Sequence, residues 1–150
     1  MATMGFKLFS GDPHVRVYPE GSTQSFKQGD LVKLSSGLVV IASSDQDVTG
    51  VALKDATTAT TGLIPVSIVD PSQIWLCEAD ATIAVTSRGV AYGLNIATAG
   101  SMSVDISDTT TTSVMVESVD LGVKNGGATT GAGGRLQVRF KYDVCDAIGG

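Results

Sequence analysis

Frequent chain breaks constrain the fold of this sequence more than any other feature. Glycines and clusters of Thr and Ser interrupt it about every 8–12 residues, which is the spacing of turns in a β-sandwich or barrel. No window keeps apolar residues at three-and-four spacing over the roughly 11–18 residues that indicate an amphipathic helix. Thr and Val, which pack well on a pleated sheet, are common between the breaks. We therefore expect an all-β protein.

The segments between the breaks have the pattern of short strands. We expect strands at residues 30–34, 38–42, 49–53, 63–69, 73–79, 82–86, 90–94, 101–106, 113–119 and 135–142. The last of these alternates most clearly between apolar and polar residues, so one of its faces should lie on a core. The apolar face contains Leu136, Val138, Phe140 and Tyr142, and the other face contains Arg135, Gln137, Arg139 and Lys141.

Two local details can be predicted within these strands. Ser35-Ser36-Gly37 has the length and composition of a three-residue hairpin loop, with Gly37 at the position that favours a positive φ. Pro65 has no N–H to donate to a sheet ladder, so the strand at 63–69 should lie at a sheet edge or contain a bulge.

The N-terminal segment, residues 1–25, does not follow the strand pattern. Its glycines and prolines argue against a regular central strand, whereas its aromatic residues argue against a solvated tail. Two alternatives remain: an extended arm that buries its anchors on another protein, or a segment that folds back over its own domain. In the first case the interface residues would be Phe6, Phe9, Val15, Arg16, Val17 and Tyr18, and we add Arg135 and Arg139 from the basic face of the last strand.

The rest of the chain reads as one domain, because 150 residues suit a single core. We place that domain at residues 26–144, with a C-terminal tail at residues 145–150. The Gly-rich stretch 122–134 predicts a long loop or a wide hairpin tip inside the domain, since it has little apolar surface to hold it in place.

The charge of the chain excludes several classes of partner. The formal net charge is −5 and the basic residues are scattered. Phosphate backbones are bound by clustered Lys and Arg, so nucleic acid is not expected as a partner. No stretch approaches the roughly 20 apolar residues of a membrane-spanning helix, and no secretory signal follows Met1. We expect a soluble chain made in a cytoplasm that has no membrane partner.

The residues needed for catalysis or for metal and cofactor binding are sparse. His14 is the only histidine, and three Cys and His residues far apart do not suggest a zinc site. Cys77 and Cys145 read as reduced and mostly buried residues. Gly126 and Gly131 have P-loop spacing, but Ala132 stands where the lysine belongs. Pairs of carboxylates in loops read as turn formers. We expect no catalytic residues, no metal and no cofactor.

Several segments resemble the capsid decoration (cement) proteins of tailed bacteriophages. The similarity is carried by Gln28–Leu34 with Gly37, by Gly50–Ala56, by Ile64–Val66, by Asp70-Pro71 through Asp80 and by the closing basic strand. It covers roughly residues 26–142 as a pattern of turns and short strands. The resemblance implies a compact antiparallel β-barrel or tulip-like domain with an extended N-terminal arm. It also implies a homotrimer on the outer surface of an icosahedral head, where it staples the major capsid protein of neighbouring capsomers.

We therefore expect a non-enzymatic structural protein of the virion that binds other protein surfaces. A carbohydrate-binding or adhesin-like domain of a virion fibre is the main alternative, and it would present Trp75 and Tyr92 on a concave face. A third hypothesis is a small hydrolase that uses acidic loop residues such as Glu78 and Asp80.

Overall fold

The computed structural model describes residues 5–43, 47–57, 62–81, 85–96, 98–119 and 135–141. The described residues form strands, turns and one short 3-10 helix, η1 (Val85–Ser87), and none of them is in an α-helix. The expected all-β fold is confirmed. The Gly-rich stretch 122–134, the tail 145–150, Cys145 and Tyr142 lie outside the described residues.

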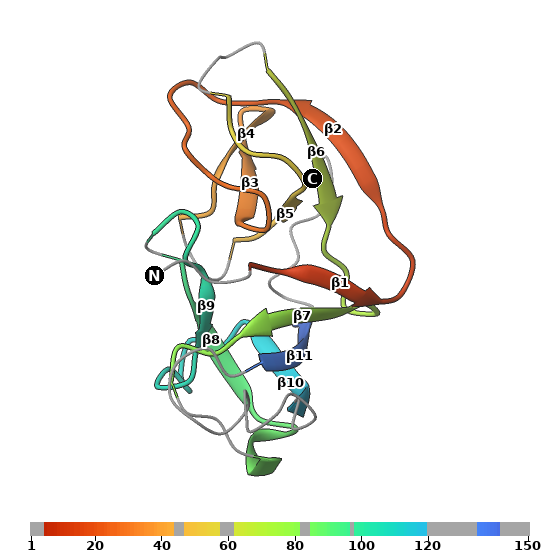
Figure 1. Ribbon diagram of the computed structural model, residues 1–150, viewed down its shortest axis with the longest axis vertical. Helices are drawn as coiled ribbons and strands as arrows, with labels where there is room; N and C mark the ends of the chain where they lie inside the picture. The colour runs from red at the N-terminus through yellow and green to blue at the C-terminus, as the bar shows by residue number, and fades with distance from the viewer. Residues whose placement is uncertain are drawn as a thin grey trace.

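The strands form two antiparallel sheets, one above the other in Figure 1. The five-stranded sheet has the order β2-β6-β5-β3-β4, and the six-stranded sheet has the order β1-β7-β11-β10-β8-β9. The strands of the first sheet are β2 (Val15–Pro19), β3 (Leu31–Ser35), β4 (Leu38–Ile41), β5 (Gly50–Ala52) and β6 (Leu63–Ile68). The strands of the second are β1 (Lys7–Ser10), β7 (Ile74–Glu78), β8 (Ala91–Asn95), β9 (Ser103–Asp105), β10 (Val114–Val119) and β11 (Arg135–Phe140).

Each sheet curls back on itself. The two edge strands of the five-stranded sheet approach each other, and in the six-stranded sheet β9 approaches β7, the neighbour of edge strand β1. A single parallel bridge joins Glu20, just after β2, to Val39 on β4, and a second joins Ala79, just after β7, to Val104 on β9. Each closure is one bridge rather than a ladder. No closed barrel is formed by the residues that the structure describes, so the barrel or tulip shape implied by the resemblance remains a prediction.

Two apolar cores result from this arrangement. The smaller core fills the inside of the curled five-stranded sheet and contains Phe26, Val39 and Ile64. The larger core lies in the six-stranded sheet and includes Trp75 and Phe140, whose rings meet edge to face with centroids 6.3 Å apart. Leu31 and Val51 of the first sheet also belong to the larger core, so the two sheets share it.

A short segment before β3 ties the two sheets together. The Gly29 carbonyl accepts from the Phe6 N–H at 2.9 Å, and the Gly29 N–H donates to the Ala52 carbonyl at 2.8 Å. The Asp30 carboxylate is buried, and it accepts from the backbone N–H groups of Lys27 (2.9 Å) and Gly100 (2.9 and 3.1 Å). We refer to residues 27–31 as the junction segment.

Most of the expected strands form with shifts of one or two residues at their ends. The alternation of the last strand is confirmed, because Leu136, Val138 and Phe140 are buried. The strand expected at 82–86 is wrong at its end, since residues 85–87 form η1. Residues 82–84 lie outside the described part of the chain.

The predicted three-residue hairpin is a two-residue one. Ser35 pairs with Leu38, which leaves only Ser36 and Gly37 in the loop. Both have positive φ, 52° and 80°. This is the type I′ turn, whose twist matches that of the flanking strands. Ser36 adopts the left-handed conformation that the prediction assigned to Gly37 alone.

The prediction for Pro65 is wrong as well, because β6 lies in the interior of its sheet between β2 and β5. The Ile68 N–H donates to the His14 carbonyl, and the Glu20 N–H donates to the Gly62 carbonyl. The backbone N–H and C=O groups of even-numbered residues in β6 therefore point toward β2. The nitrogen of Pro65 therefore faces β5, next to Leu53, which follows the last residue of that strand. The missing donor falls where the β5 ladder ends.

The N-terminal segment folds back on the chain's own sheets over its described residues. β1 pairs antiparallel with β7, and β2 pairs antiparallel with β6. The Gln73 side-chain amide donates to the Asp12 carbonyl at 2.8 Å, which fixes the connection between the two strands. Of the two alternatives for this segment, the second agrees with this pairing.

Candidate interaction surface

Part of the outer face of the five-stranded sheet is apolar and exposed. On β2, Val15 and Val17 are 52% and 57% exposed, and on β6 Leu63 is 58% exposed. Val17 is the cross-strand partner of Pro65, and Pro19 is that of Leu63, so these side chains share one face. Three valine and leucine side chains more than half exposed on one face make a patch of the kind that marks a protein contact.

Leu53 extends this patch toward β5. Its N–H donates to the Pro65 carbonyl at 2.9 Å, which places it opposite Pro65 on the same face, and it is 38% exposed. We define the apolar strip as Val15, Val17, Leu53, Leu63 and Pro65. Further along the same face, Val51 and Ser67 are buried toward the six-stranded sheet. The strip is thus the part of this face that the second sheet leaves uncovered.

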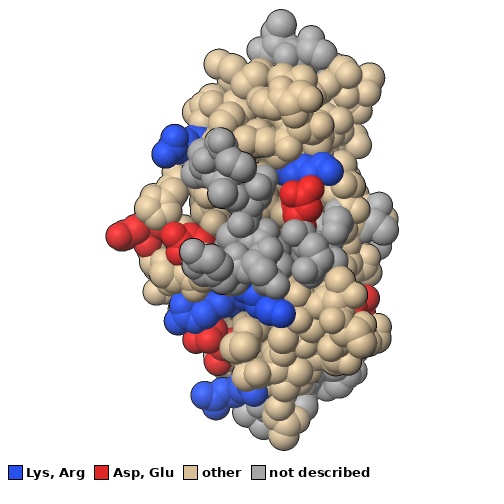
Figure 2. Space-filling view, turned by 180° about the vertical axis from the view of Figure 1, so that it is seen from behind, with Lys and Arg blue, Asp and Glu red and all other residues tan. Residues whose placement is uncertain are grey.

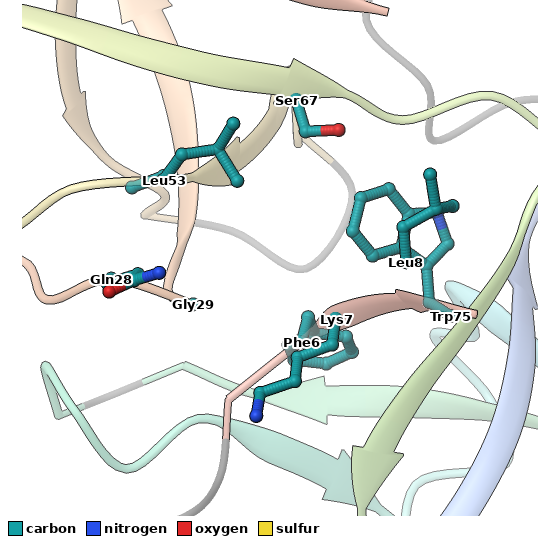
Figure 3. Close-up of a pocket in the computed structure, with 9 residues that line it drawn as sticks. Phe6, Lys7, Leu8, Gln28, Gly29, Leu53, Ser67 and Trp75 are labelled. Carbon is teal, nitrogen blue, oxygen red and sulfur yellow. The ribbon is translucent and has the colours of Figure 1, made fainter. Parts of the chain in front are cut away.

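A groove opens where the strip meets β1 (Figure 3). It has a volume of about 380 Å³. Its lining residues are Phe6, Lys7, Leu8, Gln28, Gly29, Ala52, Leu53, Ser67 and Trp75. The floor is buried, because Phe6, Ala52 and Trp75 are each at most 2% exposed, whereas Lys7, Gln28 and Leu53 at the rim are exposed. Figure 3 shows Leu53 and the Trp75 ring directed toward the space between β1 and β6.

The predicted aromatic anchors have different surroundings. Phe6 lies in the larger core, 5.9 Å from the Phe140 ring, and is therefore not available to another chain in this structure. Tyr18 alternates with Val17 and faces the smaller core, where its buried hydroxyl has no hydrogen-bond partner among the described residues. Phe9 is 56% exposed. It sits where the register between β1 and β7 shifts, and alternation along β1 places it on the same face as exposed Lys7.

The three basic residues of the predicted interface are also separated. Arg16 is exposed on β2, but it alternates with Val15 and Val17, so its side chain lies on the other face of that strand. Arg139 on β11 pairs with Glu117, with Nε and Oε2 3.1 Å apart, and donates to the Pro71 carbonyl at 3.1 Å. These contacts hold it against its own sheet. Arg135 lies on β11, half-buried, opposite Glu78 on β7. The structure thus brings together Val15 and Val17 on one face, places Arg16 on the other face of β2, and places Arg135 and Arg139 on the other sheet.

The side chains that the sequence offered for catalysis or metal binding make only ordinary contacts with their own chain. Burial raises the pKa of the Cys77 thiol far above its ordinary value, so it stays protonated. His14 is exposed, with Nε2 4.0 Å from the Asp70 carboxylate. Asp80 accepts from the Ile106 N–H at 3.2 Å, and burial raises its pKa. Within the described ranges, no three His, Cys, Asp or Glu side chains gather in a group able to hold a metal ion.

The surface seen in Figure 2 is mostly uncharged. Lys and Arg side chains lie there in small separate groups, with Asp and Glu between them. The described residues on this face therefore produce no broad field of one sign. None of the helices in the described residues is long and apolar enough to cross a membrane.

No protein-family model matches this chain, and no curated protein matches it.

The sequence identified the β2 half of the strip but missed the β5–β6 half. Val15 and Val17 stood out because they lie in a segment with anchors and no regular pattern. Leu53 and Leu63 stand at the ends of strands that read as ordinary core strands, and only the cross-strand register brings them next to Val17. Phe9 is exposed, but its role as an anchor stays a prediction, and no sequence signal predicts the register shift at its position.

Proposed function

We propose that this chain is a structural decoration protein that binds the outer surface of an icosahedral phage head and stabilises it by bridging copies of the major capsid protein. In this proposal it acts as a homotrimer, is a component of the virion and performs no catalysis. The finer shape, a barrel or tulip-like body, belongs to the same proposal.

The observation that carries the proposal is the apolar strip. Burying a Val or Leu side chain fully contributes about 1.5–3 kcal/mol, so three side chains that are more than half exposed can supply a useful part of a binding free energy. A single copy would still bind weakly after the costs of association. Several copies linked in one trimer would bind tightly, because the later contacts are intramolecular.

The choice of a phage capsid as the partner is supported by the sequence resemblance. The residues that carry it include Gln28–Leu34 and Gly50–Ala56, which contain most of the junction segment and all of β5. Leu53 and Pro65 of the strip lie in segments that carry the resemblance, Gly50–Ala56 and Ile64–Val66, and the Leu53 N–H donates to the Pro65 carbonyl at 2.9 Å. The resemblance and the strip therefore overlap at these two residues.

The test is a charge placed in the strip. We expect Val17→Glu to lower binding to expanded phage heads by at least about tenfold, because a carboxylate must then be desolvated against the capsid. The heads would be purified from the source and freed of this protein, and binding would be measured by co-sedimentation. Met115→Glu, at a residue 39% exposed on β10, is the matched control. The proposal is wrong if wild-type protein does not sediment with the heads, or if both variants bind as wild type does.

The two aromatic residues on which the carbohydrate-binding alternative depends are not exposed. Trp75 is 1% exposed and Tyr92 is 8% exposed, and both belong to the larger core. The Trp75 indole N–H donates to the Gln73 side chain at 3.3 Å, and the Tyr92 hydroxyl is 3.1 Å from that of Ser87. Neither ring presents a face on which a sugar could stack.

A further inference from the structure

We propose that the groove beside β1 receives one large apolar side chain from an extended, acidic segment of a partner protein. This inference rests on the proposed function and names the chemistry of the contact. The floor of the groove supplies the apolar environment, the open edge of β1 supplies backbone groups, and Lys7 favours carboxylates next to the inserted side chain.

The lining of the groove suits an apolar side chain. Phe6, Leu8, Ala52, Leu53 and Trp75 form most of it. The polar groups among the lining side chains are few, namely the Ser67 hydroxyl, the Gln28 amide and the Lys7 amino group. A volume of about 380 Å³ is at the small end of ligand sites, large enough for an aromatic or long aliphatic side chain.

The groove is continuous with the strip. Leu53 belongs to both, and Ser67, which lines the groove, is the cross-strand partner of Val15. A protein surface lying on Val15 and Val17 therefore ends at the mouth of the groove. Interfaces commonly combine a flat apolar area with one pocket that takes a buried anchor, and this surface has both parts.

The backbone of β1 is available beside the groove. Among the described residues, β1 is the end strand of its sheet and pairs with β7 along one edge only. Just before β1, the Phe6 N–H points away from β7 and donates to the Gly29 carbonyl at 2.9 Å, so the other edge faces the groove. Figure 3 shows β1 running along the groove, with Lys7 and Leu8 on it and Phe6 just before it. An extended chain adds to such an edge through main-chain hydrogen bonds.

The charge of the groove favours an acidic segment. Lys7 is the one charged residue among those that line it, and its side chain is exposed. In Figure 3 its amino group points away from the space between Leu53 and Trp75. In that position it can contact a carboxylate on a residue next to the one whose side chain is inserted.

Trp75 allows the groove to be tested directly, because it is the only tryptophan and lies in the floor. The probe is the peptide acetyl-Thr-Asp-Leu-Asp-Thr-amide, titrated into the full chain while Trp75 emission is recorded. We expect a saturable change with half-saturation below about 1 mM. The same peptide with Ser in place of Leu should give at least a tenfold weaker response, and a version with Lys in place of both Asp residues should also bind more weakly.

Two variants make the peptide result specific. Leu53→Glu puts a carboxylate at the mouth and should weaken peptide binding at least tenfold, whereas Met115→Glu on β10 should leave it unchanged. Both positions are partly exposed, so neither variant should unfold the chain. Lys7→Gln should reduce the preference for the acidic peptide over the lysine one.

The outcomes separate this inference from the proposed function. If no peptide changes Trp75 emission, or if Leu53→Glu binds the acidic peptide as wild type does, the groove proposal is wrong. A dependence of Trp75 emission on protein concentration that Leu53→Glu abolishes would assign the groove to a second copy and also overturn it. If Val17→Glu loses head binding while Leu53→Glu keeps it, the proposed function stands and only the groove proposal falls.

Discussion

At the scale of single residues, two glycines show how differently the fold uses the same residue type. Gly37 sits in the tight hairpin with φ of 80°, and beyond its two chain neighbours no atom of the described residues lies within 4 Å of where a Cβ would be. Gly50 on β5 needs no unusual φ, but a Cβ there would overlap the Ser67 carbonyl oxygen and the Val66 side chain. Gly37 is therefore favoured because of its backbone conformation, whereas Gly50 is favoured because there is no room for a side chain.

This difference gives a prediction with an internal comparison. Gly37→Ala should lower the free energy of unfolding by about 1 kcal/mol, the cost of a left-handed conformation for a residue with a Cβ. Gly50→Ala should cost more, about 2–4 kcal/mol, because strand β6 must shift away from β5. Urea unfolding of both variants measures the two values. Equal losses would show that β5 and β6 are not packed as closely as described.

At the scale of elements, β1 is the strand whose role differs most from its sequence pattern. Gly5, Gly11 and Pro13 surround it, and a strand with such neighbours reads as irregular. Its pairing with β7 and the burial of Phe6 make it part of the six-stranded sheet. Phe9, two residues before Gly11, lies on the exposed face of β1 with Lys7. The segment thus contributes a core residue, Phe6, just before the strand and a surface residue, Phe9, within it.

The two phenylalanines of this segment test its role. Phe6→Ala should destabilise the chain by about 3–5 kcal/mol, as expected for a buried phenylalanine that leaves a cavity. Phe9→Ala should change the free energy of unfolding by less than about 0.5 kcal/mol. Thermal or urea unfolding monitored through Trp75 gives both values. If Phe6→Ala is as stable as wild type, the segment behaves in solution as a detached arm instead.

At the scale of the whole molecule, the junction segment joins the two sheets through a buried carboxylate. Asp30 accepts one backbone N–H from its own turn and one from Gly100, just before β9. Burial raises the pKa of the Asp30 carboxyl above its ordinary value of 3.8, although the N–H donors partly oppose that effect. The ionised group therefore organises both sheets at a cost in desolvation.

The raised pKa of Asp30 determines how the free energy of unfolding changes with pH. The folded state holds the Asp30 proton more tightly than the unfolded state, so the contribution of this group is full below pH 3.8 and decreases as the pH rises through the folded pKa. We expect Asp30→Asn to remove that decrease, because the amide cannot ionise. The measurement is the difference in unfolding free energy between wild type and variant from about pH 3.5 to 7. A difference that does not vary with pH would contradict the raised pKa.

Removing the acceptor altogether should be worse. Asp30→Ala leaves the Lys27 and Gly100 N–H groups without their partner in a buried site, and we expect a loss of about 2–4 kcal/mol at neutral pH. Asp55→Ala is the matched control, since Asp55 is exposed and accepts only from the Gln28 N–H among the bonds described for it. Urea unfolding that finds equal losses for the two variants would show that Asp30 does not hold the sheets together.

The sequence alone determined the all-β class, most strand positions and the inward face of β11, because these depend on local alternation and turn residues. Tertiary structure decided the rest. The placement of β1 and β2 in different sheets, the interior position of β6 despite Pro65, and the meeting of Leu53 and Leu63 with Val17 all depend on pairings between distant segments. Local propensity contains no information about which strand edge another strand will cover, so the apolar strip and the groove became visible only once the sheets were assembled.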